Sequence, residues 1–313
     1  MSRLVVTFCA LALFATPAGA DEAFVTNQGS DDLTIIDATT MTPLATLPIG
    51  GKPAGVAVSA DGARAYVTSP EGKFLSVIDA AARRVLKKIP VGDGPLGVAV
   101  SPDGRRVYVA DTYGKRLFEI DPETGATRSL AVGAMCSGVA VAPDGKTALV
   151  ADRDDNALSV IDLAAFARVA VIPVGRHPYG VTIDAAGTRA YTANVESNDV
   201  SVVDLDARKM IASAPVGNHP YTSALAQGRL FVTNQYEGSV SVLDAATLKP
   251  LGKIRVGDYP ETIAASRDGA TLYVANWFSN ELWSIDAASL TVRAKAPTGD
   301  GPRAFGAFLR PVN

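Results

Sequence analysis

Short stretches rich in Val, Ile, Tyr and Phe follow one another along the chain after residue 20, and in many of them polar and apolar residues alternate. Runs of about four to six residues with a period of two predict β-strands. Turn-forming segments separate the runs, as at residues 102–104 and 143–145 (both Pro-Asp-Gly) and 268–269 (Asp-Gly). Glycine readily adopts the positive φ that tight hairpin turns need. The pattern therefore predicts an all-β protein.

Three sequence elements recur seven times each. The first is a glycine before a turn and a small-residue strand, with copies 40 to 42 residues apart at Gly50, Gly92, Gly133, Gly175, Gly217, Gly257 and Gly299. The second is an aromatic-rich strand, which reads YVTS at 66–69 and FVTN at 231–234. The third is an alternating strand that ends at Asp37, Asp79, Asp121, Asp162, Asp204, Asp244 and Asp286. We interpret these aspartates as turn residues whose side chains bind the following backbone.

A unit of about 42 residues holds four short strands and is too small to bury a core alone, as expected for one propeller blade. The chain therefore predicts one domain, residues 21–313, folded as a seven-bladed β-propeller with four-stranded blades. Asp21 stands directly before the second strand of a blade, and residues 305–308 match the first strand of one. We expect three N-terminal strands and one C-terminal strand to complete this blade and close the ring.

These motifs resemble the YVTN β-propeller repeat family, named for the strand at 66–69 and 231–234. Residues 98–104 (VAVSPDG) and 159–162 (SVID) match the accompanying motifs. The resemblance covers the chain after residue 20. It implies a secreted or periplasmic seven-bladed propeller and supplies no shared catalytic residues, so function has to be argued from sites rather than from the fold.

The first twenty residues have the pattern of a secretory signal peptide: Arg3, an apolar run at 4–14, and Ala-Gly-Ala at 18–20. We expect cleavage after Ala20 and a periplasmic or secreted protein. The apolar run is too short to span a membrane, and no later stretch is longer, so we expect no membrane span.

Charge and cysteine content exclude several classes. The chain has 29 Lys and Arg against 32 Asp and Glu, a net charge of −3. This balance argues against a nucleic-acid partner, which would need a basic surface. Of the two cysteines, Cys9 precedes the expected cleavage site, and Cys136 alone cannot form a disulfide framework.

Candidate chemistry appears where the repeats differ. The residues before the Pro position of the seven Gly-to-Pro turns form a ring around one channel mouth: Lys52, Gly94, Met135, His177, His219, Tyr259 and Gly301. The third turn has Cys136 in place of Pro. Imidazole, thioether and thiolate ligands favour copper or zinc over magnesium or calcium. We predict a copper site, or else a zinc site, held by His177, His219, Met135 and Cys136. The alternative is that the histidines are solvated and Cys136 is a small buried residue.

The same mouth gathers aromatic and charged residues from blades three to six. The next ring position is Ala54, Leu96, Ser137, Tyr179, Tyr221, Glu261 and Arg303, and the loops after the second strands should reach the same face. Grouped surface aromatics are typical of ligand or protein contacts. We predict that a ligand or partner binds Arg176, Tyr179, Tyr221, Tyr236, Tyr259, Glu261 and Trp277. The alternative for Trp277 is packing between blades.

The leading hypothesis is a non-enzymatic periplasmic binding or accessory module that holds a soft metal ion, a small ligand or a partner protein, such as a redox or metal-handling protein. The alternative is a propeller-type lactonase or lyase, or a propeller subunit of a periplasmic redox enzyme, with His177 or His219 as acid or base. We assign no catalytic residue, because the sequence has no nucleophile elbow, haem-attachment motif or Gly-rich phosphate loop.

Overall fold

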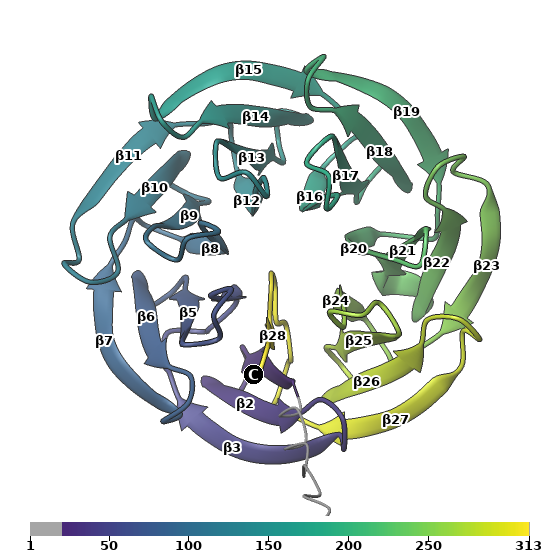
Figure 1. Ribbon diagram of the computed structural model, residues 1–313, viewed down its shortest axis with the longest axis horizontal. Coiled ribbons are helices and arrows are strands. Elements are labelled where there is room, and N and C mark those ends of the chain that lie inside the picture. Colours follow the sequence, from purple (N-terminus) through teal and green to yellow (C-terminus); the bar gives the residue numbers. More distant parts are fainter. Residues whose placement is uncertain (1–20, 313) are drawn as a thin grey trace, which may run out of the picture.

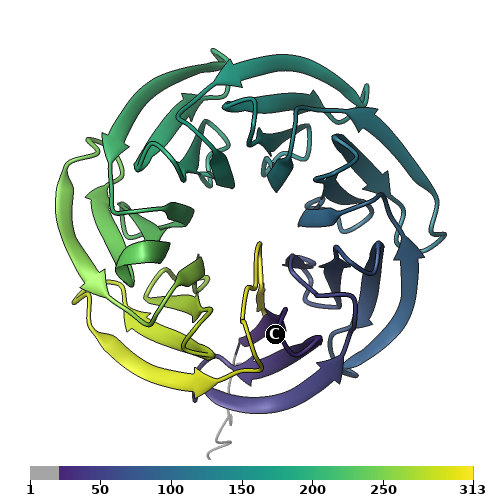
Figure 2. The ribbon, with the colours of Figure 1, turned by 180° about the vertical axis from the view of Figure 1, so that it is seen from behind.

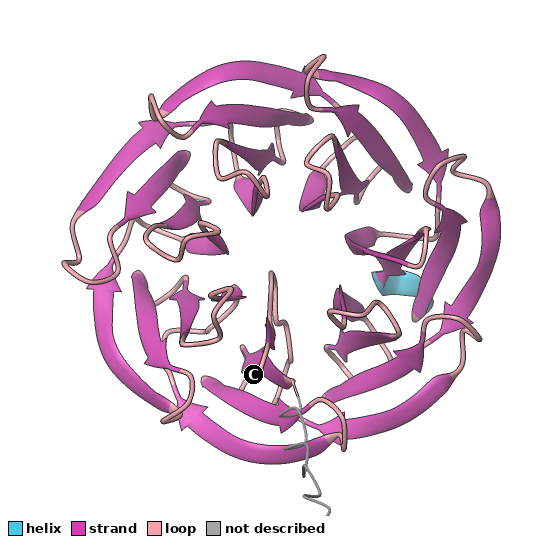
Figure 3. Cartoon of the chain, viewed as in Figure 1, coloured by secondary structure: helices cyan, strands magenta, loops and turns pink. Residues whose placement is uncertain are grey.

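The computed structural model describes residues 21–312. They form seven four-stranded antiparallel sheets around a central axis, as Figures 1 and 2 show from the two faces. Strands dominate throughout, and the one helical element of the described chain is a single 3-10 turn, η1 (Gln235–Glu237) (Figure 3). The seven-bladed propeller predicted from the repeats is confirmed. The predicted signal peptide, residues 1–20, lies outside the described residues.

The blades follow the repeats in chain order. Blade one is β4 (Val56–Val58), β5 (Arg64–Ser69), β6 (Phe74–Asp79) and β7 (Arg84–Pro90). Blade two is β8 (Pro95–Val100), β9 (Val107–Asp111), β10 (Arg116–Ile120) and β11 (Thr127–Ala131). Blade three is β12 (Cys136–Val141), β13 (Thr147–Asp152), β14 (Ala157–Asp162) and β15 (Ala167–Pro173). Blade four is β16 (Pro178–Ile183), β17 (Arg189–Asn194), β18 (Asp199–Asp204) and β19 (Lys209–Pro215).

Blade five is β20 (Pro220–Ala226), β21 (Arg229–Asn234), β22 (Ser239–Asp244) and β23 (Pro250–Arg255). Blade six is β24 (Pro260–Ala265), β25 (Thr271–Asn276), β26 (Glu281–Asp286) and β27 (Val292–Pro297). Blade seven joins both ends of the chain: β28 (Leu309–Arg310), β1 (Glu22–Asn27), β2 (Asp32–Asp37) and β3 (Thr42–Pro48).

The hydrophobic core lies between the blades. The second and third strands of a blade are buried almost throughout, because each blade packs against two neighbours, whereas outer strands such as β7 bury few residues. One core cluster, for example, joins Tyr66 of blade one to Val98 and Val109 of blade two. This explains why the second and third strands of each blade are apolar and the fourth strands are more polar.

The repeated aspartates are confirmed as turn residues. Asp37 Oδ1 accepts hydrogen bonds from the backbone N–H of Thr39 at 2.9 Å and of Thr40 at 2.7 Å. Asp244 does the same with Thr247 at 2.7 Å. These bonds lie in the turn between the third and fourth strands, and the equivalent aspartates of the other five blades each accept a bond of this kind.

The C-terminal segment closes the ring, but its regular strand lies later than expected. The yellow segment in Figure 1 runs inward, and its regular pairing with β1 is through β28, two residues long, which follows residues 305–308. Before β28 it bonds both neighbours: Phe305 O accepts from Val56 N at 3.0 Å in blade one, and Phe308 O accepts from Phe24 N at 2.9 Å. This double pairing links blade seven to blade one.

Candidate functional site: the histidine-bearing mouth

Two sets of loops build the channel mouth that carries the histidines, as predicted. Backbone N–H groups of the Gly-to-Pro turns bond side chains of second-strand loops: His177 N donates to Asn156 Oδ1, and His219 N donates to Asn198 Oδ1, both at 2.9 Å. Both histidines adopt a positive φ, of 56° and 53°. Lys52, Met135, Tyr259 and Gly301, at equivalent positions, also adopt a positive φ, so this backbone shape belongs to the repeat rather than to the histidines.

His177 lies between two carboxylates. Its Nδ1 is 3.4 Å from Glu196 Oε1 of its own blade, and its Nε2 is 3.5 Å from Asp154 Oδ1 of blade three. The side chain is 30% exposed. Arg176 beside it is exposed and donates through Nη2 to Glu196 O at 3.1 Å. This part of the mouth therefore gathers polar groups from two blades.

His219 begins a row of rings across blades five and six. Its ring stacks on Tyr236 with 3.7 Å between centroids, and its Nδ1 lies 2.9 Å from Asn218 Oδ1. Tyr236 lies 5.6 Å from Tyr259, and Tyr259 lies 5.0 Å from Phe278. We call His219, Tyr236, Tyr259 and Phe278 the mouth aromatic row. Tyr236 is 57% exposed and Phe278 is 68% exposed. Large rings this exposed are typical of interaction surfaces.

A second group closes the channel beneath the mouth. We call Tyr179, Tyr221, Glu261, Arg303 and Phe305 the channel plug. The two tyrosine rings stack 3.9 Å apart, and Phe305 packs against Tyr179 at 5.0 Å. Arg303 Nε lies 2.9 Å from Glu261 Oε2, and Arg303 donates to the hydroxyls of Tyr179, at 3.2 Å, and Tyr221. All five side chains are largely buried.

Electrostatics within the plug follow from this burial. Burial raises the pKa of Glu261, and the charge of Arg303 opposes that shift. Gln235 Nε2 also donates to Glu261 Oε1 at 2.9 Å. Burial raises the pKa of Tyr221 well above its ordinary value, so its hydroxyl stays neutral and can accept from Arg303. Tyr179, Tyr221 and Glu261, which we predicted to bind a ligand, thus satisfy one another.

One predicted metal ligand, Cys136, does not lie at the mouth with the histidines. Cys136 is fully buried in the core of blades two and three, and its thiol donates to Asp111 O at 3.1 Å. Burial raises the pKa of this thiol to about 12, so it stays protonated at neutral pH. Met135 is partly buried beside it. Among residues 21–312, no group of three or more His, Cys, Asp or Glu is placed to hold a metal ion.

Trp277 lies between the mouth and the plug. Its ring is 5.5 Å from the guanidinium carbon of Arg303, and it packs under Gly301, where an added Cβ would come within 3.0 Å of the ring. Arg303 itself was not among the predicted site residues. The signal was present, because Arg303 shares a ring position with Tyr179 and Tyr221, but sequence alone does not show that its side chain crosses the channel.

Comparisons with known proteins agree with the fold. Residues 2–106 match the family model of the YNCE-like beta-propellers. No curated protein matches the chain in sequence. Within the described part of the chain, no helix has the length and apolar character to cross a membrane.

Three solved structures are similar in fold. Hydrazine synthase of Kuenenia stuttgartiensis is 20% identical, with 81% of this chain and 89% of that one covered and a TM-score of 0.75. A functionally unknown protein from Desulfotomaculum acetoxidans is 15% identical, with 91% and 99% covered and a TM-score of 0.80. The dihydro-heme d1 dehydrogenase NirN is 21% identical, with 92% and 75% covered and a TM-score of 0.68. The resemblance inferred from the repeats is thus confirmed: the chain is a seven-bladed β-propeller similar to YVTN-repeat proteins, and its first third matches the YNCE-like family.

Proposed function

We propose that this protein is a non-enzymatic binding module whose histidine-bearing mouth docks a partner protein. The mouth aromatic row carries the proposal: four rings in contact span two blades, and two of them are more than half exposed. Aromatic anchors of this kind dominate the binding energy of protein interfaces. Contacts between neighbouring rings already restrict these side chains, which lowers the conformational cost of binding.

The channel plug supports the same proposal. The ion pair of Arg303 and Glu261 and the stacked tyrosines lie across the channel and block it beneath the mouth. A partner would therefore bind across the mouth and would not insert a segment through the central channel. Charged groups around His177, on the blade next to the row, would give the contact its polar rim.

The location and partner class belong to this proposal. The N-terminal pattern supports export to the periplasm. A periplasmic redox protein is the partner class we favour, since two propellers of similar fold are named as a hydrazine synthase and a dehydrogenase. That likeness concerns fold alone, so the partner itself has to be found by experiment.

The test uses a photo-crosslinking residue in place of Ser279, next to Phe278, in protein expressed in its host. Crosslinked partners are identified, and the affinity of the purified partner is then measured for the parent and for a Tyr236→Ser/Phe278→Ser variant. Losing two aromatic anchors of about 2 kcal/mol each should weaken binding by roughly 1,000-fold.

The matched controls are Leu251→Ser, an exposed apolar residue of the outer strand of blade five, and Asp144→Ser in a hairpin turn of the opposite face. Both should bind like the parent, with unchanged far-UV circular dichroism. Equal affinity of the double variant and the parent, or equal losses in the controls, would contradict docking at this mouth.

Soft-metal binding is a second proposal, with copper favoured over zinc. It is supported by the placement of the two histidines of the chain at equivalent positions of adjacent blades, at the same channel mouth. Since the thiol of Cys136 is buried and protonated, His177 and His219 are the residues on which this proposal depends.

A further inference from the structure

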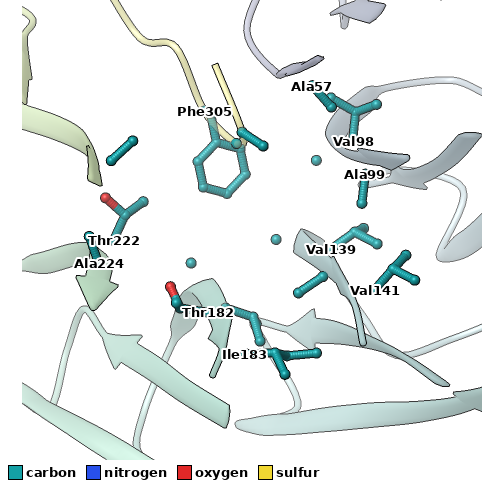
Figure 4. A pocket seen from close by; sticks show the side chains of 18 of the residues that line it. Ala57, Val98, Ala99, Val139, Val141, Thr182, Ile183, Thr222, Ala224 and Phe305 are labelled. Carbon is teal, nitrogen blue, oxygen red and sulfur yellow. The ribbon is translucent and has the colours of Figure 1, made fainter. Parts of the chain in front are cut away.

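A cavity of about 600 Å³ occupies the central channel beneath the plug. Figure 4 shows it surrounded by side chains of the innermost strands, with Ala99, Val139, Thr182 and Ala224 around the wall and Phe305 projecting into it. Pockets that hold small organic molecules typically measure 300–1,000 Å³ and are mostly apolar. The size therefore suits a ligand.

The wall of this cavity carries no charge. Among the described residues that line it, none has an ionisable side chain, and most are Ala, Val, Gly, Ile or Leu. By contrast, Asp, Glu, Lys and Arg make up 19% of the chain. Burying an unpaired charge against such a wall would be very unfavourable. The wall therefore selects against charged molecules.

Most hydroxyl groups of the wall are already paired. Thr182 Oγ1 donates to Ser223 O at 2.7 Å, and Ser223 Oγ donates to Thr182 Oγ1 at 3.0 Å. Thr222 Oγ1 donates to Glu261 O at 2.9 Å. Thr262 Oγ1 has no hydrogen-bond partner among the described residues, but it is buried away from the surface of the cavity. A molecule in the cavity would therefore meet a mainly apolar wall whose hydroxyl groups are largely paired or buried.

The cavity is closed at one end. Phe305 belongs both to its lining and to the buried cluster of Tyr179, Tyr221 and Leu96 beneath the histidine-bearing mouth. At the other end the lining reaches Ala60, Ser101, Pro102 and Ala185, in the hairpin turns between the first and second strands. Access is therefore from the face opposite the histidines.

We propose that this channel cavity binds a small, uncharged and mainly apolar organic molecule, which enters between the hairpin turns and rests on Phe305. The site is separate from the docking mouth, since the plug lies between them.

The test titrates the purified protein with two fluorescent probes. N-phenyl-1-naphthylamine is uncharged, and 8-anilinonaphthalene-1-sulfonate has the same rings with an added sulfonate. We expect saturable binding of one uncharged probe per chain and at least tenfold weaker binding of the sulfonate. Ala99→Phe and Ala140→Phe, which fill the cavity from two different blades, should each weaken binding of the uncharged probe at least tenfold.

Val171→Phe is the matched control, because it adds the same ring on an outer strand where Val171 is 50% exposed. It should bind like the parent, and so should the Tyr236→Ser/Phe278→Ser variant of the docking mouth. The two filling variants keep the test valid if one of them does not fold. No saturable binding, equal binding by a folded filling variant, or equal affinity for the sulfonate would each overturn the proposal.

Discussion

At the scale of single residues, one buried position recurs at the end of each second strand. Asn occupies it in four blades, and in blade five Asn234 Oδ1 accepts from the N–H of Gly217 at 2.9 Å. In blade three Asp152 makes the equivalent bond to Gly133 at 2.9 Å and also accepts from Ser159 Oγ. The carboxylate loses its hydration there, and this burial raises the pKa of Asp152 from its ordinary 3.8 to about 6.

We predict that Asp152→Asn stabilises the protein at neutral pH. Because the folded-state pKa is raised, the contribution of Asp152 is fully favourable below about pH 4 and is lost as pH rises through about 6. A shift of this size corresponds to roughly 3 kcal/mol at most. The amide keeps the bond to Gly133 without the charge. Urea unfolding at pH 4, 5, 6 and 7 measures the free energy of unfolding of both proteins. The value for the variant should rise relative to that of the parent as pH increases. A constant difference between the two proteins would contradict this account.

At the scale of elements, ring closure depends on a segment with little regular structure. Its strand is only β28, yet Arg303 N donates to Thr26 O at 2.8 Å, and Val58 N donates to Ala307 O at 2.9 Å. Phe308 is fully buried in the core of blades six, seven and one. Side-chain burial and pairing with two blades together replace the long ladder of other inner strands.

We predict that deletion of residues 302–313 leaves an open blade edge and produces aggregated protein, because the unpaired N–H and C=O groups of β1 and β4 become available to other chains. Deletion of residues 312–313 alone is the control and should remain soluble. Sedimentation and thermal melting measure both forms. If the protein that lacks residues 302–313 is soluble and has the parental melting temperature, ring closure does not need this segment.

At the scale of the whole molecule, Arg303 connects distant parts of the ring. It reaches Tyr179 of blade four, Tyr221 of blade five and Glu261 of blade six, and it donates to Gln28 Oε1 at 2.9 Å in blade seven. The plug is thus a set of cross-channel contacts that only the closed ring can form.

We predict that Arg303→Met lowers the free energy of unfolding by about 3–5 kcal/mol, because it leaves the buried carboxylate of Glu261 unpaired. The double variant Glu261→Gln/Arg303→Met should recover most of that loss, since no charge is then buried. Urea denaturation of the parent, both single variants and the double variant gives the coupling energy. Additive losses would indicate that the ion pair does not act as a unit.

The metal proposal also belongs to this scale, since its ligands come from neighbouring blades. We predict that copper-loaded, desalted protein retains about one metal ion per chain and that the His177→Ala/His219→Ala variant retains none. Binding should weaken as pH falls, because the ligands must lose protons. Cys136→Ser is the matched control and should retain the metal, because the thiol is buried. Mass spectrometry measures the metal content. Equal retention by the parent and the double-histidine variant would leave the histidines as ordinary mouth residues.

The sequence by itself determined the fold, because the information is local and repeated. Period-two strands, Asp-containing turns and glycines recur seven times, and the incomplete first and last repeats indicate how the ring closes. Ring alignment also placed His177, His219 and the mouth aromatics on one face. These inferences need only the spacing of residues within a blade.

Tertiary structure alone decided what those residues do. Tyr179, Tyr221, Glu261 and Arg303 occupy one ring position, but only their convergence across the channel makes them a plug. Likewise, the position of Cys136 in a turn did not reveal that its thiol enters the core between two blades. The uncharged channel cavity arises from small side chains on six different inner strands and Phe305. Such features depend on distances between blades, which no pattern within a single repeat contains.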